Sequence, residues 1–357
     1  MEYRWFPDSR SIIAICADGV SWPVLQIDFN HQVQRLSRSE PAFRWLATIS
    51  HSGTVAWEES NWSGTGLLLV RSQQSKKDYI LQDLNPQIKH WDLGFQRVVH
   101  WKNSRKEDME GILIQPANYV EGTRYPLIVD AYPHISNSFK GSPMLGNQSW
   151  ASKGYVIFFP NARAPHVYEN FFKSQNFDQA ARGPRGWDVT LDDVTTGVNE
   201  LIAEHVVDPD RMGLYGFSNG GGIVNYLVTR TNRFKCAVSI AGALADWVRP
   251  VFLRTDSPVP RWAGGLTPWS DPEAYVQLSA VFHLDRVTTP MLLADGDEDG
   301  EFLLDTIEMY NGLRRLSRSV TLLRYPGQGH GFTGKALKDF AQREDAFFSG
   351  CLLGSNQ

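Results

Sequence analysis

The 357-residue sequence lacks features that define several protein classes. It has three cysteines, Cys16, Cys236 and Cys351, too few and too widely spaced for a disulfide framework or a cysteine-based zinc site. We therefore expect three separate thiols that act as small, buried, hydrophobic groups. Lysine and arginine do not cluster, and a net charge of −4 gives no reason to expect a nucleic-acid partner.

Long hydrophobic runs are also absent. No stretch of about 18 apolar residues, the length that a membrane-spanning helix needs, occurs in the sequence. The first residues, MEYRWFPDSR, lack the apolar core of a signal peptide. The sequence as it stands therefore predicts no membrane partner and a cytoplasmic protein. If an export signal precedes Met1, we expect a periplasmic or secreted protein instead.

The first hundred residues have the sequence pattern of an all-β region. They hold half of the tryptophans, and short apolar runs such as SIIAI, TVAW and GLLLV alternate with turn-forming segments, which is typical of antiparallel strands. Residues 5–15 and 56–84 are expected to belong to separate four-stranded units. The charged segment KNSRKED indicates a domain boundary, which we place between residues 104 and 105.

From residue 105 onward, strands and helices alternate. Helical spacing of apolar residues predicts one helix from Asp188 to Ile202 and another from Leu303 to Leu316. Seven near-continuous apolar runs are expected to be strands buried on both faces of a mostly parallel sheet: Gly111–Gln115, Pro126–Ala131, Tyr155–Pro160, Met212–Gly216, Cys236–Ala241, Pro290–Ala294 and Val320–Tyr325. This alternation predicts a doubly wound α/β domain whose ligands bind at the carboxyl ends of the strands.

The stretch RMGLYGFSNGGG places Ser218 directly after one predicted strand, and the next helix is expected from Ile223. Gly216, Gly220 and Gly221 lack side chains, as a sharp strand-to-helix turn with a serine at its apex requires. G-x-S-x-G in this context is typical of a nucleophile elbow, and the helix start offers N–H groups to an oxyanion. A nucleotide phosphate loop would need Lys and then Ser or Thr after the glycines, and neither follows.

A nucleophilic serine needs a base, and the base needs an acid that orients it. Only His283 and His330 follow Ser218 in the sequence. His330 lies in a glycine-rich loop directly after a predicted strand, whereas His283 precedes one. His330 is therefore the predicted base.

The acid is expected on the loop that follows residues 290–294. This loop, LLADGDEDGEF, offers Asp295, Asp297 and Asp299 at every second position. A calcium loop begins in the same way, with oxygen ligands at positions 1, 3 and 5 and glycine at 6, but it needs a glutamate at position 12. Thr306 stands there, and a strand rather than a helix precedes the loop. A non-catalytic calcium-binding scaffold is therefore the less favoured alternative.

From about Gly111 to Leu353 the sequence resembles the prolyl oligopeptidase family of serine peptidases, α/β-hydrolase relatives of dipeptidyl and acylaminoacyl peptidases. The segments YPLIVDAYP, GYVIFFPNARA, VDPDRMGLYGFSNGG, TPMLLADGDEDGEF and YPGQGHGF follow the order typical of the family. The resemblance implies a Ser-Asp-His triad, an acyl-enzyme intermediate, a short peptide as substrate, and no metal or cofactor. An esterase with the same triad is the alternative, because a fold does not decide its substrate.

The resemblance also assigns roles within the loops. The family pattern His-Gly-x-x-Asp selects Asp299 as the acid, with Asp297 as the fallback, and Asp295 replaces the family's histidine with its role left open. It further implies that the Tyr132 hydroxyl and the backbone N–H of Asn219 hold the oxyanion.

Three more residues are candidates for the substrate pocket. Trp247 and Phe252 lie where the family has aromatic pocket residues, but Pro250 breaks the usual pattern, so proline specificity is not implied. Glu301 follows the acid by two positions. It either faces a substrate amino group or is a solvated surface carboxylate, and the second reading is the more frequent one for glutamate.

The first 104 residues resemble the last part of the β-propeller that precedes the hydrolase domain in this family. A blade takes roughly forty residues and a propeller four to eight blades, so only about two fit here. We expect a fragment of a longer protein, or a short form whose open strand edges another chain covers. The predicted organisation is a partial β-propeller over residues 1–104 and an α/β-hydrolase domain over residues 105–357. Its expected partners are a peptide substrate and either missing blades or a second copy in an oligomer.

Overall fold

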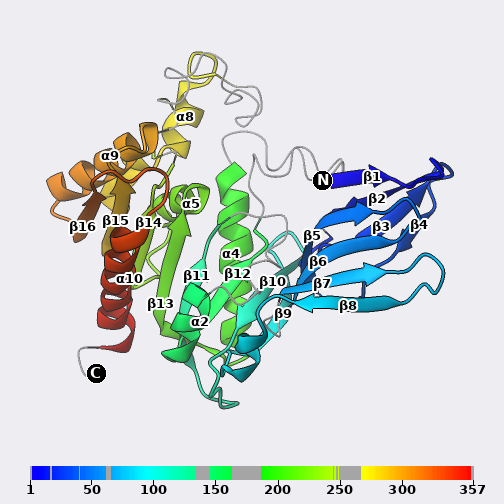
Figure 1. The fold of residues 1–357 in the computed structure, drawn as a ribbon. Coiled ribbons are helices and arrows are strands. Elements are labelled where there is room, and N and C mark those ends of the chain that lie inside the picture. The colour runs from blue at the N-terminus through cyan, green and yellow to red at the C-terminus, as the bar shows by residue number, and fades with distance from the viewer. Residues whose placement is uncertain are drawn as a thin grey trace. The chain divides into compact units, whose positions relative to one another are not determined.

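The computed structural model in Figure 1 describes residues 2–16, 18–39, 41–61, 66–132, 145–162, 186–243, 245–246, 248 and 267–354. Within them the chain forms two four-stranded sheets and one eight-stranded sheet. Two compact units divide the chain. One comprises Met1–His100, Glu110–Tyr119 and Ile135–Tyr155, and the other Trp101–Met109, Val120–His134 and Val156–Gln357.

The two small sheets are antiparallel, and each strand pairs with the next one in sequence. Their strands are β1 (Glu2–Trp5), β2 (Ser11–Ile15), β3 (Val24–Asp28) and β4 (Val33–Arg35), then β5 (Ala42–Ile49), β6 (Val55–Asn61), β7 (Gly66–Arg71) and β8 (Asp78–Asp83). Apolar side chains from both sheets form one core that includes the fully buried Ile13, Trp57 and Leu69. The prediction of two four-stranded units in this region is confirmed.

Strand β8 is an outer strand of the second small sheet. Three consecutive large side chains on it, Tyr79, Ile80 and Leu81, are exposed. An exposed hydrophobic edge strand can pair with a further strand. The expected cover for this edge, further blades or another chain, stays a prediction.

The eight-stranded sheet has the order β16-β15-β14-β13-β11-β12-β10-β9. Its strands are β9 (Gln96–Lys102), β10 (Asp108–Ile114), β11 (Tyr125–Asp130), β12 (Val156–Pro160), β13 (Val207–Phe217), β14 (Cys236–Ile240), β15 (Met291–Gly296) and β16 (Val320–Tyr325). Neighbouring strands from β11 to β16 run parallel. Every residue of β12, β14 and β15 is buried, as expected for strands covered on both faces. All seven predicted strands are present.

The remaining strand of this sheet, β9, begins before the predicted domain boundary. Its sequence, QRVVHWK, mixes buried and exposed positions, which fits its place at the edge of the sheet. No continuous apolar run marked it as part of the sheet. The boundary predicted between residues 104 and 105 therefore falls inside the sheet, between β9 and β10.

Helices connect and cover the parallel strands (Figure 1). Their bounds are α2 (Leu145–Ser152), α4 (Gly186–Ala203), α5 (Asn219–Leu227), α8 (Pro272–Leu278), α9 (Glu301–Arg315) and α10 (Gly334–Phe348), with short 3₁₀ or π turns η1 (Pro86–His90), η2 (Ala280–Arg286) and η3 (Ser349–Leu353). Helices α4 and α5 contact β13, and α9 contacts β15 and β16. No helix in the described parts of the chain combines the length and hydropathy that spanning a membrane requires.

The expectation of three separate thiols is wrong for one pair. Cys236 and Cys351 form a disulfide that links residues 115 positions apart, with Cα atoms 6.4 Å from each other. Cys236 begins β14, and Cys351 lies in η3, which contacts the neighbouring strand β13. This long-range contact left no local signal in the sequence. Cys16 is a free thiol, as expected, but it is half-buried rather than buried.

Candidate active site

Ser218 stands at a sharp turn between β13 and α5. Its backbone has φ of 55° and ψ of −120°, a conformation that L-residues rarely adopt and that costs free energy. The Ser218 N–H donates to the carbonyl oxygen of Ile240 at 2.8 Å, and the Ser218 carbonyl oxygen accepts from the Gly222 N–H at 3.0 Å. These bonds hold the serine in its strained conformation at the carboxyl end of the strand.

Close backbone approach explains the glycines around this turn. A Cβ on Gly216 would lie 2.2 Å from the carbonyl oxygen of Gly220, and one on Gly222 would lie 2.3 Å from that of Ala243. Any side chain at these positions would therefore force the turn apart. The tight fit also lets helix α5 begin at Asn219, four residues before its predicted start, because packing here overrides the low helix propensity of glycine.

The structure brings together Ser218, His330 and Asp299. The Nε2 atom of His330 lies 2.8 Å from the Ser218 Oγ. On the other side of the ring, Nδ1 lies 3.0 and 2.9 Å from the two carboxylate oxygens of Asp299. The Asp299 side chain is 5% exposed and that of His330 is 39% exposed, so the acid is shielded while the imidazole remains accessible. A proton can pass from the serine hydroxyl to an imidazole held in this way.

The other two alternating acids have different partners. Asp297 pairs with the Arg324 guanidinium at 3.0 Å. Asp295 is fully buried, and its oxygens accept from the Gly296 N–H at 2.8 Å and from the Thr306 hydroxyl at 2.7 Å. Among the described residues, no three His, Cys, Asp or Glu side chains are arranged to hold a metal ion. Asp297 and Asp295 thus bind different groups, Arg324 and Thr306, an arrangement that does not fit a calcium loop.

Two aromatic rings that sequence reasoning missed flank the imidazole of His330. The ring centroid of Phe302 lies 4.4 Å from that of His330, and the ring of Phe217 lies 5.1 Å from it. Phe217 is the variable residue of the G-x-S-x-G motif, and Phe302 ends the stretch LLADGDEDGEF. Both residues lie within the two motifs that carry Ser218 and Asp299, and this position in the sequence is the signal that could have identified them. Packing on both rings restricts rotation of the imidazole.

Tyr132 follows β11 and packs against the first turn of α5. A Cβ on Gly220 would lie 3.1 to 3.3 Å from three atoms of Tyr132, so the tyrosine touches this glycine closely. The backbone N–H of Tyr132 donates to the Asp130 carboxylate at 3.1 Å. Burial, and then the charge of Asp130, raise the pKa of the Tyr132 phenol, which therefore keeps its proton and can donate it. Asn219 is the first residue of α5, where N–H groups lack intrahelical acceptors.

The remaining candidates are His283 in η2, Glu301 at the start of α9, and two residues outside the described ones. His283, the less favoured base, is buried in η2 with its Nε2 atom 3.0 Å from the Val276 carbonyl oxygen, and burial lowers its pKa. Glu301 is the first residue of α9, where a helix dipole favours a negative charge. Trp247 and Phe252 lie outside the residues that the structure describes.

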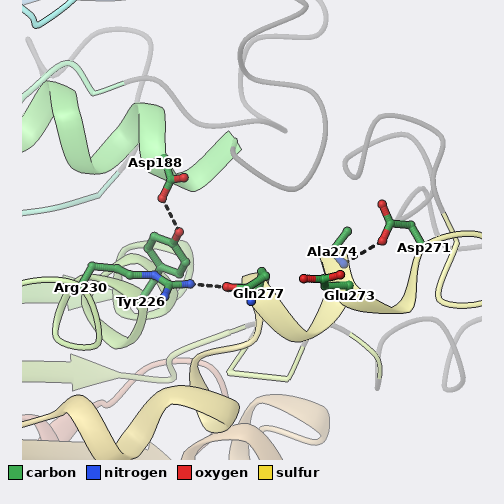
Figure 2. Close-up of a pocket in the computed structure, with 7 residues that line it drawn as sticks. All are labelled: Asp188, Tyr226, Arg230, Asp271, Glu273, Ala274 and Gln277. Carbon is green, nitrogen blue, oxygen red and sulfur yellow. Dashed lines mark hydrogen bonds between the residues drawn. The ribbon is translucent and has the colours of Figure 1, made fainter.

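A polar pocket of about 520 Å³ lies beside the last turn of α5, and its lining was not singled out from the sequence (Figure 2). The Tyr226 hydroxyl donates to the Asp188 carboxylate at 2.7 Å, and the Arg230 guanidinium donates to the Gln277 carbonyl oxygen at 2.5 Å. Asp271, Glu273 and Ala274 complete the lining. These bonds join α4, α5 and the residues after α5 to α8, so the groups that make them serve helix packing.

Comparison with known proteins agrees with the geometry. Residues 143–355 match the model of the Prolyl oligopeptidase family. The chain is 29% identical over 238 residues to YuxL, an uncharacterized peptidase of Bacillus subtilis, covering 62% of this chain and 33% of that protein. It is 25% identical over 266 residues to a lasso peptide isopeptidase of Asticcacaulis excentricus, covering 70% and 36% of the two chains.

A puromycin-hydrolyzing peptidase of Mycobacterium tuberculosis has a similar solved structure, with a TM-score of 0.80 and 19% identity over 99% of this chain and 54% of that one. The likeness confirms the predicted fold, an α/β-hydrolase domain preceded by a β-rich region. The chain spans about a third of the length of the two curated relatives and about half of the solved chain. The family model covers more than half of the chain, which therefore belongs to the prolyl oligopeptidase family.

Proposed function

We propose that this chain acts as a serine peptidase on short peptides. The observation that carries the proposal is the continuous hydrogen-bonded path from the Ser218 Oγ through His330 to Asp299. The strained serine at the end of a parallel strand gives further support, since this is how a nucleophile elbow presents its hydroxyl. Membership of the prolyl oligopeptidase family, with relatives named as peptidases, supports a peptide bond as the substrate.

The proposed reaction has two halves. In the first, the Ser218 Oγ attacks the scissile carbonyl carbon while His330 accepts the hydroxyl proton. The tetrahedral intermediate then collapses, the C–N bond breaks, and His330 gives the proton to the leaving amine. In the second half, His330 takes a proton from a water molecule whose oxygen attacks the acyl-enzyme, and the same proton returns to Ser218 as it leaves. Asp299 holds the imidazole and stabilises its charged form throughout.

We assign the oxyanion hole to the Asn219 N–H and the Tyr132 hydroxyl. The N–H of Ser218 is occupied by the Ile240 carbonyl oxygen, so the next N–H along the chain is the suitable backbone donor. The close contact between Tyr132 and Gly220 supports the second donor, because it keeps the tyrosine beside the same helix start. Two donors aimed at one developing negative charge lower the barrier to acyl transfer.

A fluorophosphonate probe tests the nucleophile. We expect it to label the wild-type protein and the variant Ser152→Ala, whose serine is exposed on α2, but not Ser218→Ala. Parallel turnover of a peptide amide and the matching p-nitrophenyl ester tests the substrate. Cleavage of the amide supports the peptidase, whereas turnover of the ester alone would identify an esterase. Full activity in Ser218→Ala would exclude both.

A further inference from the structure

Asp295 is a buried acid whose partners in the described part of the chain include no cation. It lies in β15, four residues before Asp299, and it is fully buried. Its oxygens contact the Gly296 N–H and the Thr306 hydroxyl, both neutral groups. Among the described residues that act on its charge there is no lysine, arginine or histidine, and the one charged group is Asp299. An ionised carboxylate in this place would be costly, whereas a neutral carboxylic acid would not.

We propose that Asp295 is a neutral carboxylic acid that donates a hydrogen bond to Asp299 and so positions His330 through it. The inference rests on the proposed peptidase function, since it takes Asp299 as the acid that orients the base. A protonated carboxyl has one O–H donor, and an ionised carboxylate accepts only. Two adjacent carboxyl groups that hold a single proton complement each other, while two ionised ones repel.

The titration of Asp295 agrees with this arrangement. Burial first, and then the hydrogen bond and charge of Asp299, raise the pKa of Asp295 to about 7, while Thr306 and the Gly296 amide lower it. Of the groups in the described residues that act on Asp295, which are Thr306, the Gly296 amide and Asp299, only Asp299 is titratable. Above this pKa the two acids become like charges, and Asp299 no longer holds the imidazole in place. Activity should therefore fall at alkaline pH.

The pH profile of kcat/KM separates positioning from a merely structural role. In the wild type we expect activity to rise as His330 loses its proton and to fall again as Asp295 ionises. Asp295→Asn keeps a hydrogen-bond donor but has no proton to lose. It should therefore retain activity near pH 6 and lose the alkaline limb, which is the fall in kcat/KM at alkaline pH. Asp295→Ala removes the donor, and the misplaced Asp299 should lower activity at every pH, by about 100-fold if the triad shifts by an ångström.

Two further variants sharpen the test. Thr306→Val removes a hydrogen bond that lowers the pKa of Asp295, so the alkaline limb should move to higher pH. Asp297→Asn is the matched control, because it makes the same change two residues along the loop in an acid that pairs with Arg324. We expect the alkaline limb of Asp297→Asn to stay where it is in the wild type.

An alkaline limb that persists unchanged in both Asp295→Asn and Thr306→Val overturns the inference. Fluorophosphonate labelling distinguishes this result from failure of the proposed function. If the wild type is labelled at Ser218 and the limb persists, only the role of Asp295 is wrong. If the wild type is not labelled, the peptidase proposal itself fails. If Asp295→Ala does not fold, the other two variants still decide.

Discussion

The antiparallel sheets and the eight-stranded sheet both bury acidic side chains, but they neutralise them differently. Glu59 on β6 is 3% exposed and lies directly across from Arg44 on β5, which is 1% exposed. The Arg44 Nε lies 2.6 Å from a Glu59 carboxylate oxygen. In the eight-stranded sheet, Asp295 has no such cation and faces a second acid, Asp299.

This difference indicates what each buried acid does. The Arg44–Glu59 pair is closed within two neighbouring strands, where it fixes their register and leaves no charge for chemistry. Asp295 and Asp299 stand at the carboxyl end of β15, where a neutral group next to an ionised one can be tuned for proton transfer. Buried charge therefore serves the fold in one region and, as we propose, the reaction in the other. Four substitutions test this division.

Replacing His330 by alanine should have the largest effect. We expect kcat/KM for a peptide amide to fall by about five to six orders of magnitude, because a triad works as a unit. The free energy of unfolding should change far less, since the ring is partly exposed. His100→Ala is the control, with an exposed side chain on β9 and unchanged kinetics expected. Activity near that of the wild type would show that His330 is not the base, and the eight-stranded sheet would then not be the site of the reaction.

Glu59→Ala should act on stability alone. It leaves the Arg44 guanidinium buried without its carboxylate, which should lower the free energy of unfolding by about 3–5 kcal/mol in urea titrations. The rate per folded molecule should not change. Glu58→Ala is the matched control, because the neighbouring residue points to the opposite, less buried face of β6. Equal losses in the two variants would show that the ion pair contributes nothing specific.

Tyr132→Phe should lower the rate of the reaction and leave the free energy of unfolding nearly unchanged. Loss of one oxyanion donor should lower kcat by about 100-fold to 1,000-fold with little change in KM, while the half-buried ring still packs against Gly220. Tyr325→Phe is the control, because its hydroxyl donates to Asp339 rather than to the site. That variant should lose about 1 kcal/mol of stability and keep its kcat. An unchanged kcat in Tyr132→Phe would mean that backbone N–H groups hold the oxyanion without the Tyr132 hydroxyl.

Much of the eight-stranded sheet could be predicted because central strands such as β12, β14 and β15 are buried on both faces. Strands of that kind have continuous apolar runs, and such runs located β10 to β16. The expectation of burial on both faces is wrong for β16, an edge strand with partly exposed side chains, and β13 begins five residues before its predicted start. Ser218, His330 and Asp299 could then be named from their order on loops after strands, with the family pattern choosing among the acids. The structure places His330 within hydrogen-bonding distance of both Ser218 and Asp299.

Features that depend on distant parts of the chain could not be predicted. Strand β9 is an edge strand with a mixed pattern, and the Cys236–Cys351 disulfide joins segments that only the fold brings together. Helix α5 begins at Asn219 because backbone packing, rather than propensity, decides its first turn. The role of Asp295 was open, since its burial, its bond to Thr306 and its closeness to Asp299 appear only in three dimensions.

The smallest expected effect concerns the pH dependence of stability in Asp295→Asn. The folded-state pKa of Asp295, about 7, lies above its ordinary value of 3.8, so the folded protein binds this proton more tightly than the unfolded chain does. Its contribution to the free energy of unfolding is present at acid pH and is lost as pH rises through the folded value. Between pH 4.5 and 7.5 the wild type should lose on the order of 2 kcal/mol more stability than Asp295→Asn. Urea titrations at several pH values measure this difference, with Glu59→Gln as a comparison from the antiparallel sheets. Parallel curves for the wild type and Asp295→Asn would mean that Asp295 is ionised when folded, and the contrast between the two regions would then disappear.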